Sequence, residues 1–134
     1  MRIESRHGRI YATPERVYSL ISDFSHINTT MLPPNDKITD VQTTPDSCSF
    51  TIANAGRMGM KIVERQENKL LKMENSEPGP FQFKMWIQLK EFNITESAVK
   101  VTLDADVNPL MKMMLKKPLT EFVESLVTKL EQIR

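Results

Sequence analysis

The sequence predicts one α+β domain, residues 1–134, in which a curved, seven-stranded antiparallel sheet surrounds a long C-terminal helix. Two observations carry this prediction. Between residues 37 and 107, short segments of alternating apolar and polar residues are separated by turn residues, as in an antiparallel sheet. From Pro109 to Ile133, apolar residues recur every three or four positions, which is the pattern of one helix face. Such a face needs an apolar surface to cover it, and the sheet is the surface available.

Composition narrows the class of protein. The 134 residues suit a single domain, and 18 basic against 17 acidic residues leave a net charge of +1. This balance lacks the basic excess of nucleic-acid-binding proteins, so we expect no nucleic-acid partner. The single cysteine, Cys48, excludes an internal disulfide. The charged N-terminal residues lack the apolar core of a signal peptide, and no run approaches the ~20 apolar residues of a membrane span. We therefore expect a cytoplasmic protein without an integral membrane segment.

The N-terminal quarter predicts a strand and two short helices. Residues Arg2–Tyr11 form the strand, with a bulge near Gly8 because the apolar residues on either side have opposite parity. Thr13 is a suitable N-cap and Pro14 a suitable first residue for the first helix. We place the second helix at Asp23–Leu32, before two consecutive prolines.

Six further strands complete the predicted sheet. The inner face is clearest in the fifth of these, where Phe83, Met85 and Ile87 alternate with polar residues and with Trp86. A sheet with one apolar face must have that face covered. The six strands are placed at Lys37–Thr43, Ser47–Ala53, Met58–Gln66, Lys69–Asn75, Phe81–Phe92 and Ser97–Val107.

The C-terminal helix is predicted to begin at Pro109 with Asn108 as its N-cap. Pro118 lies inside it and removes one backbone hydrogen bond. Because the apolar stripe keeps its phase across Pro118, we expect one kinked helix rather than two. The stripe comprises Met111, Leu115, Leu119, Phe122, Leu126, Leu130 and Ile133.

The order of elements, together with the first helix, resembles the START-like superfamily, also called SRPBCC. The resemblance covers the whole chain, and the local residues that carry it are Ala12, Pro14, Glu15, Val17, Tyr18, Leu20 and Asp23. It implies a helix-grip fold, in which the sheet curls around the last helix and leaves an apolar cavity between them. It also implies binding of hydrophobic small molecules, as in many members, which include lipid-transfer domains and polyketide cyclases/dehydrases.

The leading hypothesis for function is a non-enzymatic carrier or sensor that binds an apolar small molecule or lipid in this cavity, without a cofactor or metal. Nine methionines suit an adaptable apolar pocket, although methionine also fills ordinary cores. The predicted lining residues are Phe24, Met31, Phe50, Met60, Ile62, Met73, Phe83, Met85, Ile87, Val101, Leu103, Met111, Leu115, Leu119 and Phe122.

Two alternatives remain open, an enzyme of the cyclase/dehydrase type and a protein-interaction module whose interior is filled by its own side chains. An enzyme needs polar groups inside the cavity. Glu64 shares the parity of Met60 and Ile62 and would be a buried acid if that parity holds to the strand end; exposure at the strand end is the favoured reading. His7 shares the parity of an inward residue, and His26 lies near the expected cavity mouth, but structural or solvated roles are favoured for both.

Basic residues gather at the start of the last helix. Lys112, Lys116 and Lys117 stand beside Met113 and Met114. Together they could form a basic and apolar rim for an anionic lipid or a membrane surface. A solvated helix face is the favoured alternative.

Overall fold

The computed structural model describes residues 1–26, 38–54, 56–79 and 81–134 and has the predicted α+β architecture. The sheet is antiparallel and eight-stranded over these residues, in the order β1-β8-β7-β6-β5-β4-β3, with β2 also paired to β8. The elements are β1 (Arg2–Glu4), β2 (Gly8–Ile10), α1 (Pro14–Ile21), a 3-10 turn (Phe24–His26), β3 (Ile38–Thr43), β4 (Ser47–Ile52), β5 (Gly56–Gln66), β6 (Leu70–Asn75), β7 (Gln82–Asn93), β8 (Glu96–Asp106) and α2 (Pro109–Leu130).

The strand count differs from the prediction because the first strand is divided in two. β1 pairs Ile3 with Leu103, and β2 pairs Gly8 with Val99, both on β8. Between them the chain leaves the ladder. The Ser5 hydroxyl oxygen there accepts a hydrogen bond of 2.9 Å from the backbone N–H of Val101, so the break remains attached to β8. The predicted irregularity is therefore present as a gap between two short strands.

Helix α1 begins as predicted, since the Thr13 side chain accepts a hydrogen bond from the Arg16 N–H and Pro14 occupies the first turn. Val17 and Ile21 are buried beneath it. Of the second predicted helix, Asp23–Leu32, the described residues form only the 3-10 turn Phe24–His26. The remainder lies outside the described residues.

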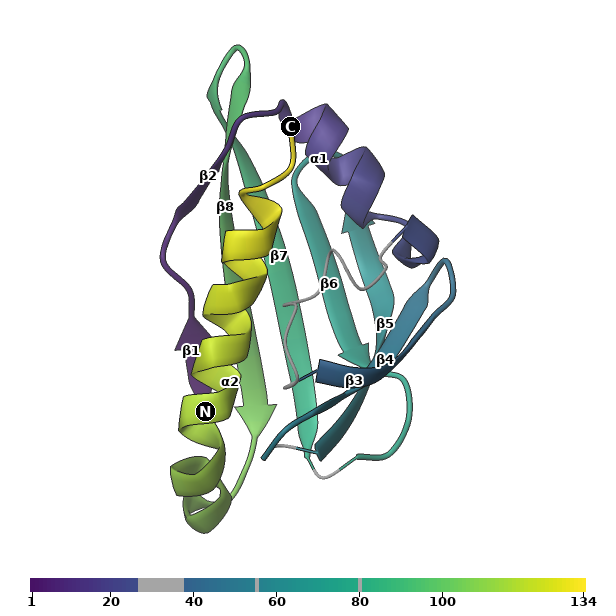
Figure 1. Cartoon of the computed structure of the whole chain (residues 1–134), viewed down its shortest axis with the longest axis vertical. Coiled ribbons are helices and arrows are strands. Elements are labelled where there is room, and N and C mark those ends of the chain that lie inside the picture. The colour runs from purple at the N-terminus through teal and green to yellow at the C-terminus, as the bar shows by residue number, and fades with distance from the viewer. Residues whose placement is uncertain (27–37, 55, 80) are drawn as a thin grey trace.

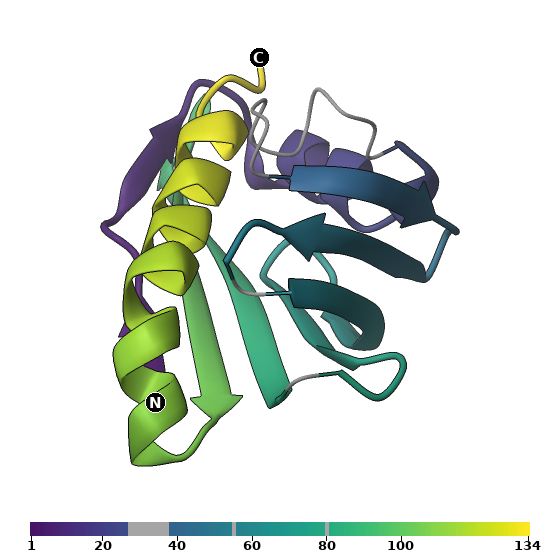
Figure 2. The ribbon, with the colours of Figure 1, turned by 60° about the horizontal axis from the view of Figure 1, so that its bottom comes forward.

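Helix α2 runs without interruption from Pro109 to Leu130, so Pro118 does not divide it. The side chain of Asn108 caps its first turn by accepting a 2.8 Å hydrogen bond from the Met111 N–H. The helix lies along β8 on the concave side of the sheet, and the sheet curls from β8 round to β4 and β3 on the far side of the interior (Figures 1 and 2). Its predicted stripe is buried from Leu115 to Ile133, and Met111 is half-buried.

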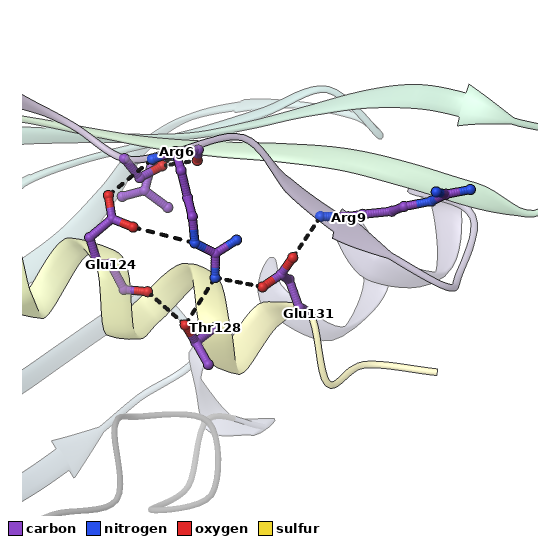
Figure 3. Close-up of polar contacts among 7 residues, drawn as sticks. Arg6, Arg9, Glu124, Thr128 and Glu131 are labelled. Atoms are coloured by element: carbon purple, nitrogen blue, oxygen red, sulfur yellow. Dashed lines mark hydrogen bonds and ion pairs between the residues drawn. The ribbon is translucent and has the colours of Figure 1, made fainter.

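Residues 2–10, which we call the strap, hold the second half of α2 from the side away from β7 (Figure 1). The Arg6 guanidinium donates hydrogen bonds to Glu131 at 2.7 Å and to the Thr128 hydroxyl at 3.1 Å (Figure 3). Glu124 accepts from the Arg6 backbone N–H, and Glu131 also accepts from the backbone N–H of Arg9. These contacts join the first ten residues to the last turns of the chain.

Close approach of the strap to α2 requires glycine at position 8. A Cβ atom on Gly8 would lie 2.6 Å from the Val127 Cγ1 and 3.0 Å from the Val99 Cγ1. Both distances are shorter than packed carbon atoms allow. The absence of a side chain on Gly8 thus lets β2 pack directly against the helix.

Candidate functional site

The concave face of the sheet carries a continuous apolar row opposite α2. Strand register pairs Ile62 with Met73, Met73 with Met85, and Met85 with Leu103. The row therefore crosses β5, β6, β7 and β8 at one level. Both methionines at its centre are almost completely buried. Methionine side chains are unbranched and polarizable, so this part of the interior can change shape at low cost.

The predicted lining residues come together in one core, within the described chain. Ile62 and Met111 are half-buried and pack against this core from its edges. Met31 lies outside the described residues. The buried members are Phe24, Phe50, Met60, Met73, Phe83, Met85, Ile87, Val101, Leu103, Leu115, Leu119 and Phe122.

An aromatic pair connects the helix to the far side of the curved sheet. The rings of Phe50 on β4 and Phe122 on α2 have centroids 5.4 Å apart and planes tilted by 30°. Both side chains are buried. Strand β4 therefore approaches α2 closely enough for side-chain contact, and the interior at this level is filled by the protein's own rings.

Phe24 is held over one end of the sheet by a backbone hydrogen bond. Its N–H donates to the Pro45 carbonyl at 2.9 Å. Arg65 reinforces this position because one guanidinium nitrogen donates both to the Ser22 carbonyl at 3.2 Å and to the Asp46 carboxylate at 2.7 Å. The segment after α1 is thus fixed to the β3–β4 turn and to β5.

Several core residues were not among the predicted lining set. Val123 and Val127 of α2 are fully buried, because the strap covers a second side of the helix there. Their spacing of four from Leu119 marks a second apolar row beside the predicted stripe, but this spacing does not indicate that the strap covers the row. Met58 and Leu71 are also buried and have the inward parity of their strands, so alternation alone could have identified them.

The polar residues considered for catalysis do not enter the core. Glu64 is exposed and accepts a 2.6 Å hydrogen bond from Gln66, because a register shift between Ile62 and Glu64 ends the alternation on which its inward placement depended. The inward-facing alternative for His7 is likewise excluded, since its side chain is exposed in the gap between β1 and β2. The side chain of His26 lies outside the described part of the structure.

Cys48 is the one titratable side chain of the described residues that burial alters strongly. It lies on the inner face of β4, and burial raises the pKa of its thiol to about 11. The thiol is therefore protonated at neutral pH and a poor nucleophile. Across the part of the chain that the structure describes, no three His, Cys, Asp or Glu side chains are grouped to hold a metal ion.

The few buried hydroxyl groups are already bonded to the protein. Ser97 donates to the Ala12 carbonyl at 2.6 Å, and Ser5 donates to the Arg6 carbonyl at 2.7 Å. No buried side-chain nitrogen or oxygen of the described residues lacks a partner. The described interior thus offers a ligand apolar contacts and no unpaired polar side chain.

A depression of about 630 Å³ lies at the ends of β6, β7 and β8. Its wall includes Glu74, Lys84, Asp104 and Asp106, which makes it polar. No residue of α2 lines it. It is therefore distinct from the predicted cavity between α2 and the sheet.

The fold is shared with solved structures of low sequence identity. A START superfamily protein from Mycobacterium smegmatis superposes with a TM-score of 0.73 at 18% identity, covering 97% of this chain and 94% of the other. A protein from Thermus thermophilus gives 0.75 at 19% identity, covering 98% and 95%. A conserved protein from Geobacillus kaustophilus gives 0.70 at 14% identity, covering 98% and 93%. No family model and no curated protein matches the sequence.

These structural similarities define the fold of the chain. It has the START-like, or SRPBCC, helix-grip fold, as the sequence predicted. Among the described helices, none is long and apolar enough to cross a bilayer.

Proposed function

We propose that this protein binds an apolar small molecule or lipid between α2 and the concave face of the sheet and acts as a carrier or sensor. The observation that carries the proposal is the apolar row Ile62–Met73–Met85–Leu103, which has methionines at its centre. A ligand entering there would displace flexible side chains and break no hydrogen bond. START-superfamily proteins with this fold commonly bind hydrophobic ligands, which supports the same assignment.

The driving force for binding would be apolar burial. Each Å² of apolar ligand surface removed from water contributes roughly 25 cal/mol, and cavities that hold small molecules have volumes of about 300–1,000 Å³. Binding would therefore require a cavity of this size to open, with Met73 and Met85 among the side chains that move aside. The packed rings of Phe50 and Phe122 would form one wall of that cavity.

Binding is tested by titrating the protein with an environment-sensitive dye and with a fluorescent fatty acid. We expect saturable binding, which Met85→Lys abolishes by placing a charge in the apolar row. The matched control is Gln88→Lys, which adds the same charge to the exposed face of the same strand and should leave binding unchanged. Met73→Phe is a second, uncharged variant, which fills the space and should weaken binding even if Met85→Lys fails to fold.

The outcome that contradicts the proposal is equally specific. Equal binding by wild type, Met73→Phe and Gln88→Lys would place the probe outside the row. No binding of any apolar probe would favour the interaction-module alternative. Mass spectrometry of small molecules extracted after gentle purification would then identify a natural ligand or leave the interior filled by protein alone.

A further inference from the structure

The first turns of α2 present apolar side chains to solvent. Leu110, Met113 and Met114 are 69%, 82% and 66% exposed. The first buried residue of the helix is Leu115. The beginning of α2 also extends past the ends of the neighbouring strands (Figures 1 and 2). No other described element therefore covers these three side chains.

The three side chains form one face of the helix. Positions 110, 113 and 114 are related by three and four residues, and Lys117 continues the same face at the seventh residue. Leu115 and Leu119 lie on the opposite side, toward the core. We call Leu110, Met113, Met114 and the lysines Lys112, Lys116 and Lys117 the basic tip.

Charge on the basic tip is of one sign. From Val107 to Thr120 the sequence contains three lysines and no acidic residue, and the first acidic residue of the helix is Glu121. All three lysines are exposed, and none forms an ion pair with another described residue. The second half of the helix differs, since Glu124 and Glu131 there bind Arg6.

The charge of Lys112 does not serve the stability of the helix. Positive charge in the first turns opposes the helix dipole, whose N-terminal end is positive. Lys112 and Lys116 are also four residues apart, a spacing at which like charges repel. Exposed apolar side chains and unpaired positive charge thus occur together in the first turns of α2. A partner with an apolar layer and negative charge would bind both.

We propose that the basic tip docks on an anionic membrane surface. Leu110, Met113 and Met114 would enter the boundary between headgroups and acyl chains, while Lys117 on the same face contacts acidic headgroups. Lys112 and Lys116 have the spacing of Leu115 and Leu119 and would approach the headgroups from the flanks of the exposed end of the helix. A second copy of the chain fits less well, because a symmetric contact would bring the lysines of both copies together. Nucleic acid fits less well because the centre of the face is apolar and contains no arginine.

The test is co-sedimentation of the whole protein with vesicles of phosphatidylcholine alone or with added phosphatidylserine. Wild type should bind the anionic vesicles more tightly, and high salt should weaken that binding by screening. Each lysine that reaches the surface contributes about fivefold to partition, so Lys112→Gln/Lys116→Gln/Lys117→Gln should reduce binding by about fivefold if Lys117 alone reaches it and by about a hundredfold if all three do. Leu110→Gln/Met113→Gln should reduce binding while retaining the salt dependence.

The matched control removes the same charge elsewhere. Lys61→Gln/Lys84→Gln/Lys90→Gln removes three exposed lysines from the strands and lowers the net charge by the same three units. Its binding to anionic vesicles should stay within about twofold of wild type at a salt concentration that screens net charge. An equal loss in both triple variants would overturn the proposal, as would the absence of binding to anionic vesicles. Binding to an oligonucleotide in preference to vesicles would overturn it in favour of a nucleic-acid partner.

Every substituted side chain on the basic tip is exposed, so the variants are expected to fold, and thermal melts check this. The dye titration described above serves as an independent readout. Variants of the basic tip should still bind the apolar dye, because the docking surface and the interior are separate. Loss of vesicle binding with normal dye binding therefore addresses the docking proposal alone.

Discussion

Two segments of α2, Pro109–Met114 and Leu115–Leu130, contrast in what they contact, and we call them the first and second halves for brevity although the second is longer. From Leu115 onward the helix has the sheet on one side and the strap on another, and its apolar side chains are buried. From Pro109 to Met114 no residue is buried, although three of the six residues are Leu or Met with exposed side chains. Apolar residues of similar size thus occupy opposite environments within a single helix.

This difference shows that apolar content alone does not assign a role to a helix segment. In the second half, burial between two surfaces contributes to folding stability. In the first half, Leu110, Met113 and Met114 expose apolar surface to solvent and, unlike Met111, do not pack against the core. We therefore expect substitutions in the second half to affect stability, and substitutions in the first half to affect association with a partner.

The largest expected effect tests the buried half. Leu119→Ala and Phe122→Ala should each lower the free energy of unfolding by about 2–5 kcal/mol, because each removes a buried side chain and leaves a cavity. Phe122→Ala also removes the ring contact with Phe50. Urea denaturation followed by circular dichroism measures both changes.

Met113→Ala is the matched substitution in the exposed half. Its effect on the free energy of unfolding should remain within about 0.5 kcal/mol, as for other surface positions. A loss comparable to that of Leu119→Ala would mean that the first turns of α2 are covered in solution. Such a result would remove the contrast between the two halves.

A smaller effect is expected where the strap meets the helix. Gly8→Ala places a methyl group 2.6 Å from the Val127 Cγ1, so either β2 or the helix must move. We expect a loss of about 1–3 kcal/mol, which is typical of overpacking. Val127→Ala in the same chain should recover part of it by creating space. Thermal melts of the two single variants and the double variant measure this coupling.

If Gly8→Ala and Val127→Ala were simply additive, the strap would not press on the helix. The second half of α2 would then be supported by the sheet alone. The coupling energy therefore measures how much the strap contributes to the environment of the buried half.

Much of the fold was predictable because its signals are local. Alternation located the six strands from β3 to β8 within a few residues, since Phe83, Met85 and Ile87 all face the core. Capping residues located both helix starts, at Pro14 and at Pro109. The same periodicity predicted the burial of the proposed lining residues, whose described members are buried or packed against the core.

The remainder depends on contacts between distant residues. Glu64 is exposed, as the favoured reading had it, but the register shift in β5 that turns it outward depends on pairing with β6. Val123 and Val127 were missed because their burial depends on the strap, more than a hundred residues earlier in the chain. Sequence periodicity describes one face at a time and does not indicate when a second surface covers a helix.

The smallest expected effect concerns the polar end of the strap. The Arg6 guanidinium donates a hydrogen bond to Glu131 and holds the pKa of that carboxyl below its usual range. A carboxyl whose pKa is lowered by folding stabilises the folded state above its unfolded pKa, near 4.3, and loses this contribution as the pH falls through the lowered value. The contact is near the surface, so Glu131→Gln should cost about 0.2–1 kcal/mol at pH 7.

This pH dependence distinguishes the ion pair from packing. The difference in unfolding free energy between wild type and Glu131→Gln should be constant from neutral pH to about 5 and then shrink on further acidification. Glu67→Gln, on the exposed β5–β6 turn, is the control and should show no such difference at pH 7. A Glu131→Gln difference that persists in acid would show that the end of α2 is held by shape alone. The Arg6–Glu131 ion pair would then contribute no stability, and the apolar contacts of the strap would account for all of the stability that the strap gives to α2.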